Sequence, residues 1–154
     1  MRRMRLLSAA ALVVMAACLD STAAPVNADT APMSASIEGT TWVASAVQVA
    51  IDGEAGTLSV VGGGEGTNTN ISISLTATVP GTYSLGPGGP GAATVGLSTG
   101  QTWTSSGVGA SGSLIVTTLS NTHVAGTFSF TGTALSGGAV GVVHVTNGKF
   151  DVTR

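Results

Sequence analysis

The chain has 154 residues, of which 8% are charged, 4% are aromatic and 23 are glycine. This composition excludes a nucleic-acid-binding protein, because phosphate binding needs clustered cations and three of the five cations are the arginines at positions 2, 3 and 5. The length favours one domain whose core needs no stabilising disulfide, and Cys18 has no second cysteine with which to pair.

The first eighteen residues have the pattern of a targeting signal. A basic leader at residues 1–5 precedes an uncharged run at residues 6–17, as in a signal peptide. The run is too short for a membrane-spanning helix, which needs about 20 apolar residues. The segment 15–18 (MAAC) resembles a lipobox, in which the cysteine receives a diacylglycerol thioether and becomes the new N-terminus. We therefore expect a signal peptide over residues 1–17 and a lipidated Cys18.

The expected membrane partner and location follow from this cysteine. The alternative is cleavage by the ordinary signal peptidase after Ala28, but that site lies far beyond the hydrophobic run. A multiply acylated cysteine, carrying palmitate or similar chains, anchors a protein stably. Leu19 rather than an aspartate follows Cys18, and the resemblance to enterobacterial lipoproteins then favours the outer membrane of the cell envelope.

Residues 18–38 are predicted to be the lipidated N-terminus and a flexible, disordered tether. They contain no glycine and no hydrophobic periodicity, whereas all 23 glycines lie from Gly39 onward. About twenty flexible residues reach roughly 25 Å, enough to hold a domain clear of lipid headgroups. A single domain is expected over residues 39–154. Removal of residues 1–17 would leave two cations against seven acids in the mature chain, a net negative charge that also argues against nucleic acid as a partner.

From Thr40 onward the hydrophobic period is two, which is typical of β-strands. Ile71 and Ile73, like Phe128 and Phe130, alternate with serine and threonine, and no window has the period of a helix. Nine or ten short strands predict an all-β domain, either an antiparallel β-sandwich or a flattened β-barrel. The expected strands cover residues 41–50, 57–61, 71–79, 81–85, 93–98, 101–105, 112–119, 127–131, 139–146 and 149–152.

The last two of these segments are predicted to form a hairpin. They flank Asn147-Gly148, the pair that a two-residue type I′ turn favours because both residues need a positive φ. This register would place His144 opposite Asp151 as an exposed cross-strand pair rather than a catalytic dyad. Four apolar residues would share the buried face: Val143, Val145, Phe150 and Val152.

Four short segments follow one another along the chain, namely residues 81–83 (GTY), 112–117 (GSLIVT), 126–130 (GTFSF) and 145–150 (VTNGKF). Their order and spacing resemble an uncharacterised family of bacterial envelope lipoprotein domains. The resemblance covers roughly residues 40–154 and implies a domain of unknown function. It carries over no catalytic residue.

The motifs for cofactors, metals and catalysis are weak. Residues 86–91 (GPGGPG) match G-x-G-x-x-G, but Pro90 and the strand-like sequence after it exclude the helix that a dinucleotide site requires. The glycine-rich residues 62–66 lack the Lys-Ser/Thr ending of a phosphate-binding loop. His123 and His144 form no metal-ligand pattern. We therefore expect no cofactor, no metal and no catalytic residues, and hence no enzyme.

Trp42, Tyr83 and Trp103 could stack on sugar rings, but a domain with six aromatic residues needs large side chains in its core. The core is the favoured place for both tryptophans, and Trp103 is the better of the two as a candidate for ligand stacking. The sequence thus predicts a non-catalytic β-domain that a lipid anchor displays from the envelope, with a binding or structural role and an unknown protein or glycan partner. Two alternatives are open, a carbohydrate-binding module and a barrel that carries a small apolar ligand.

Processing at Cys18 is testable in a bacterial host. The Cys18→Ser variant should accumulate as an unlipidated precursor, because serine cannot form the thioether. Metabolic labelling with a clickable fatty acid should mark the wild type only. Equal labelling of the two proteins would contradict the lipoprotein interpretation.

Overall fold

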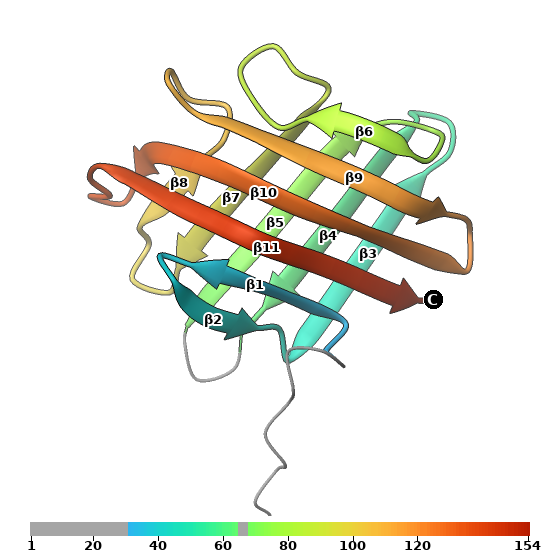
Figure 1. Ribbon diagram of the computed structural model, residues 1–154, viewed down its shortest axis with the longest axis horizontal. Helices are drawn as coiled ribbons and strands as arrows, with labels where there is room; N and C mark the ends of the chain where they lie inside the picture. The colour runs from blue at the N-terminus through green and yellow to red at the C-terminus, as the bar shows by residue number, and fades with distance from the viewer. Residues whose placement is uncertain (1–30, 65–67) are drawn as a thin grey trace, which may run out of the picture.

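The structure, a computed structural model, describes residues 31–64 and 68–154. The expectations about the signal peptide, Cys18 and residues 18–30 lie outside these residues, as do positions 65–67 of the glycine-rich stretch. The described residues contain no helix and form eleven strands in one antiparallel sheet (Figure 1). The strands are β1 (Met33–Ile37), β2 (Thr40–Val43), β3 (Ala46–Asp52), β4 (Thr57–Gly63), β5 (Thr69–Thr76), β6 (Gly81–Ser84), β7 (Gly91–Leu97), β8 (Thr102–Thr104), β9 (Ser111–Leu119), β10 (His123–Ser136) and β11 (Val142–Thr153).

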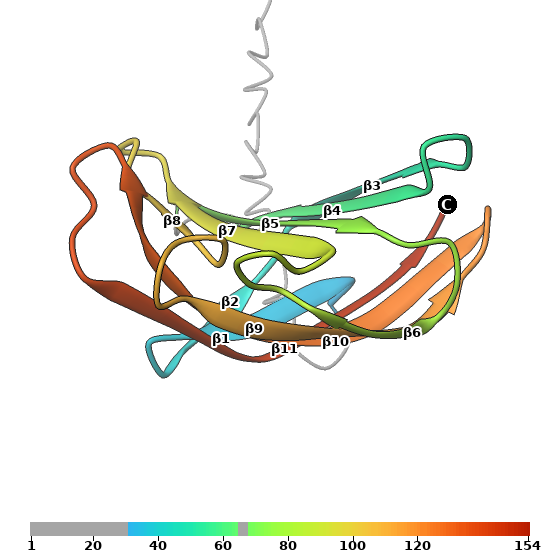
Figure 2. The same cartoon turned by 90° about the horizontal axis from the view of Figure 1, so that it is seen from above.

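The sheet curls over into two facing layers (Figure 2). One layer contains β3, β4, β5 and β7, and the other contains β2, β1, β11 and β10 together with β9 and β6. The short strand β8 forms the corner, because it pairs with β7 on one side and with the end of β10 on the other. The hydrogen-bonded strands follow the order β2-β1-β11-β10-β8-β7-β5-β4-β3, so β2 and β3 lie at its two ends. The predicted all-β fold is confirmed, as a flattened half-barrel rather than two separate sheets.

The two layers enclose the core through period-two alternation. In β5, and in β10 up to Ala134, the apolar residues point inward while most serines and threonines are at least partly exposed. Three phenylalanines stack inside, with ring centroids 6.5 Å apart for Phe128 and Phe130 and 6.4 Å for Phe128 and Phe150. The outer surface carries little charge. Six of the described residues are formally charged: Glu38, Asp52, Glu54, Lys149, Asp151 and Arg154.

The folded domain begins before Gly39, within the stretch predicted to be a tether. Strand β1 pairs with both β2 and β11, and Met33 is 0% exposed. Composition missed β1 because the strand is short, rich in small residues and free of glycine. Glu38 and Gly39 have φ values of +50° and +79°, so the first glycine marks the tight turn between β1 and β2 rather than a domain boundary.

The predicted C-terminal hairpin is wrong, because β11 runs without a turn from Val142 to Thr153 and pairs with β10 along its length. His144 lies opposite Thr131, and Asp151 lies opposite Ala125. The imidazole of His123 contacts Asp151 instead, with 2.8 Å between Nε2 and Oδ1.

Asn147-Gly148 forms a β-bulge in the middle of β11. Phe128 lies opposite Gly148 and Phe130 opposite Val145, so the β11 side has one extra residue. Asn147 takes a φ of +51°. A bulge reverses the alternation of the strand beyond it, and both Val145 and Phe150 are therefore buried. Three of the four residues predicted on the buried face, Val143, Val145 and Phe150, are therefore buried although the predicted turn is wrong, and Val152 is half-buried.

The bulge predicts a strict need for glycine at position 148. A Cβ there would lie 2.5 Å from the Phe128 ring, which cannot move aside because it is packed between Phe130 and Phe150. Gly148→Ala should lower the free energy of unfolding by about 1–3 kcal/mol, as overpacking does. Urea titration measures this loss.

The matched control is Gly53→Ala, where a Cβ would meet no atom within 4 Å. This change should alter stability by less than about 0.5 kcal/mol. Equal stability of the two variants would contradict the placement of the bulge.

Candidate ligand-binding cavity

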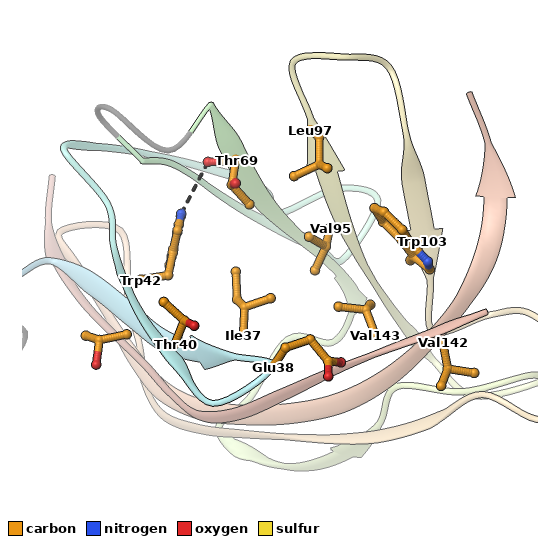
Figure 3. A pocket seen from close by; sticks show the side chains of 11 residues that line it. Ile37, Glu38, Thr40, Trp42, Thr69, Val95, Leu97, Trp103, Val142 and Val143 are labelled. Carbon is orange, nitrogen blue, oxygen red and sulfur yellow. Dashed lines mark hydrogen bonds between the residues drawn. The ribbon is translucent and has the colours of Figure 1, made fainter. Parts of the chain in front are cut away.

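A cavity of about 320 Å³ lies between the two layers at one end of the half-barrel (Figure 3). At this end β1 and β7 finish, and β2, β5, β8 and β11 begin. Strand ends of this kind form the mouths of β-barrels, where ligand sites are common. Seven lining residues are apolar or aromatic: Ile37, Trp42, Val95, Leu97, Trp103, Val142 and Val143. Four are polar: Glu38, Thr40, Thr41 and Thr69.

The two tryptophans of the chain stand on opposite sides of this cavity (Figure 3). Trp42 is 3% exposed and Trp103 is half-buried. The indole N–H of Trp42 donates to the carbonyl oxygen of Thr69 at 3.2 Å, and that of Trp103 donates to the carbonyl oxygen of Val140 at 3.2 Å. The polar atom of each indole is therefore already bonded to the protein. What each ring offers a ligand is carbon surface.

Gly62 in β4 brings the two layers together beside Trp42. A Cβ on Gly62 would lie 2.8 Å from the Trp42 ring and 2.6 Å from the Met33 sulfur. Glycine is needed here because the opposite layer fills the space that a side chain would take. The close approach at Gly62 lets Trp42 pack against the layer that contains β3, β4, β5 and β7, at the wall of the cavity.

Glu38 is the one charged residue among the described residues that line the cavity. Its backbone N–H donates to the carbonyl oxygen of His144 at 3.0 Å, and its carboxylate accepts a hydrogen bond from the backbone N–H of His144. These bonds hold Glu38 in its place in the turn between β1 and β2. The two described cations, Lys149 and Arg154, do not line the cavity.

The aromatic residues that the sequence singled out are only partly brought together. Trp103, the candidate for stacking, and Trp42 both line the cavity. Tyr83 does not, and its hydroxyl donates to the carbonyl oxygen of Val79 at 2.6 Å. The role of Trp42 in the cavity wall was missed. The one available signal was the repeated Thr-Trp at the start of two strands, at residues 41–42 and 102–103.

Neither histidine is among the residues that line the cavity, although the backbone of His144 is bonded to Glu38. His123 contacts Asp151 through its ring, while Ser120 Oγ accepts a hydrogen bond from the His123 backbone N–H at 3.0 Å rather than from the ring. The Nδ1 of His144 lies 3.2 Å from the Thr131 hydroxyl. In the hydrogen bonds among residues 31–64 and 68–154, neither imidazole joins a carboxylate to a hydroxyl.

Two further searches of the described residues found nothing. They hold no group of three or more His, Cys, Asp or Glu side chains placed to bind a metal ion. Within the same residues, no helix has the length and apolar character needed to cross a membrane.

The fold and the cavity together define an all-β half-barrel domain with an apolar, tryptophan-lined cavity at one end. The chain belongs to the family described as a domain of unknown function (DUF6252), which matches residues 29–152. This match includes β1, in agreement with the folded boundary seen in the structure. No curated protein and no solved structure matches the chain.

The different burial of the two tryptophans is testable by fluorescence. The chain has only these two, so Trp42→Phe reports Trp103 and Trp103→Phe reports Trp42. Acrylamide should quench the emission of Trp103 several-fold more strongly than that of the buried Trp42. Equal quenching in the two variants would contradict the geometry of the cavity.

Proposed function

We propose that this protein is a non-catalytic binding module, anchored to the bacterial cell envelope through Cys18, whose β-domain holds an apolar ligand in the tryptophan-lined cavity. One observation carries the proposal. The wall is mainly aliphatic and aromatic, and both indole N–H groups are already bonded to backbone carbonyls. A cavity of this kind favours apolar molecules over water, because water finds few hydrogen-bond partners there.

The size of the cavity supports a small ligand. An engineered cavity of about 150 Å³ in another protein takes up benzene, and this cavity has about 320 Å³. Two fused rings or a medium-length acyl chain would therefore fit. The cavity is too small for a folded peptide or for both chains of a phospholipid.

The second candidate is carbohydrate binding, which the half-buried Trp103 favours. Sugar recognition combines stacking with hydrogen bonds to the ring hydroxyls, and a site built for them needs polar side chains beside the aromatic ring. Both indole N–H groups are already bonded to the backbone, and only four of the eleven lining residues are polar. The apolar ligand is therefore the better fit.

The anchor and the absence of catalysis have separate support. The MAAC segment at residues 15–18 supports lipidation, and Leu19 supports the outer membrane. A serine or threonine nucleophile needs an imidazole that a carboxylate orients. The described histidines offer these two contacts on separate rings, which supports a binding role rather than catalysis.

The proposal is testable with N-phenyl-1-naphthylamine, a neutral dye that fluoresces in apolar sites. The domain should bind it, and Leu97→Gln should weaken binding about tenfold or more, because a buried leucine contact is worth roughly 1.5 kcal/mol or more. Ile115→Gln is the control, since Ile115 is also exposed in part but lies outside this cavity.

Three outcomes decide the matter. Loss of dye binding in Leu97→Gln alone supports the cavity as the ligand site. Failure of the wild type to bind the dye, or equal loss in both variants, overturns it. A shift of Trp103 emission on adding dextran, with no response to the dye, would favour the carbohydrate alternative.

A further inference from the structure

We infer that the ligand is a single-chain amphiphile with an uncharged or cationic head group, and that Glu38 determines this specificity by excluding anionic amphiphiles such as fatty acids. The inference rests on the proposed function, because it concerns the same cavity. It starts from the uneven distribution of charge around an otherwise apolar wall.

The charge lies at one edge of the cavity. Figure 3 shows Glu38 beside Ile37 and Val143, on the side away from Leu97. Glu38 is exposed, and Thr40 and Thr41 follow it at the same edge. A ligand whose chain lies between the tryptophans would therefore place its polar end against this carboxylate.

Glu38 cannot easily turn away from such a head group. Its carboxylate accepts the backbone N–H of His144, and its own backbone N–H is bonded to His144 in return. A carboxylate has two oxygens and several acceptor positions, so one hydrogen bond leaves capacity for a donor on a ligand. A hydroxyl or ammonium group can donate there, whereas an ionised carboxylate cannot.

No described cation offsets this negative charge within the cavity wall, since neither Lys149 nor Arg154 lines it. An anionic head group would meet a fixed like charge beside a low-dielectric wall, where repulsion is stronger than in water. A buried or half-buried carboxylate is favoured where a cation pairs with it. Among the described lining residues this edge offers two threonine hydroxyls but no cation, and it carries a negative charge of its own.

The apolar surface fits one chain of moderate length. The cavity of about 320 Å³ has roughly twice the volume of the engineered cavity that takes up benzene, so it suits one acyl chain of moderate length. Two exposed apolar residues are close to Trp103 in the backbone. Val140, whose carbonyl oxygen accepts the Trp103 indole N–H, is 79% exposed, and Leu135, which follows the Ala134 that pairs with Trp103, is 60% exposed.

The experiment compares three ligands of equal chain length. Decanol, decylamine and decanoate are titrated into the domain at pH 7.5 and low salt, and displacement of N-phenyl-1-naphthylamine is measured. Decanol and decylamine should displace the dye at concentrations at least tenfold lower than decanoate. Salt at 1 M should narrow this gap, because screening weakens the repulsion.

Glu38→Gln tests the residue itself. Glutamine keeps a carbonyl oxygen for the His144 N–H and removes the charge, so decanoate should approach decanol to within about threefold while decylamine weakens. Glu54→Gln is the matched control, because Glu54 is an exposed acid that does not line the cavity. It should leave all three affinities unchanged.

The outcomes separate the two proposals. Equal displacement by all three ligands in the wild type overturns the inference and leaves the apolar cavity intact as the site. Unchanged discrimination in a folded Glu38→Gln protein also overturns it. If that variant does not fold, the salt dependence of the wild type decides, since a gap that stays constant from low salt to 1 M rules out a charge effect. Failure of the dye to bind at all overturns the proposed function itself.

Discussion

The bulge at Asn147-Gly148 is the constraint on which both ends of the half-barrel depend. In an uninterrupted strand, Val145 and Phe150 would face opposite sides, because they are an odd number of residues apart. The bulge turns both inward, so that β11 contributes Val143 to the cavity wall and Phe150 to the core. Its partners on either side, β1 and β10, both show the register shift that the bulge imposes. One extra residue in β11 thus sets the register of its pairing with both neighbouring strands.

The cavity follows from the way in which the sheet curls. Strand β8 turns the corner between the layers, and it is also the strand that carries Trp103. Gly62 lets the layers touch beside Trp42. Between these two positions the ends of the strands leave a cavity of about 320 Å³, which Ile37, Val95 and Leu97 help to line. The hydrogen bonds to Thr69 and Val140 keep the two indoles at its sides.

The sequence was informative where a local pattern has one physical solution. Alternation in residues 71–79 or 127–131 fits only a half-buried strand, so the all-β fold and most buried faces could be predicted. Asn147-Gly148 was ambiguous, because a positive φ serves a bulge as well as a turn. Strand β1 was missed because MSASI has little local signal and is held by distant partners. The cavity could not be predicted from the sequence, since its walls come from six strands that only the fold brings together.

The hydroxyl-covered outer faces have a further consequence for the behaviour of the molecule near a surface. Six formal charges among the described residues, four acidic and two basic, give the domain only a weak electric field. Serine and threonine keep the surface hydrated without attracting counterions. If the proposed anchor holds such a domain beside an anionic lipid layer, the charges of the described residues would neither draw it down onto the headgroups nor push it strongly from them. External salt would then change its position little, because these residues carry little charge for salt to screen.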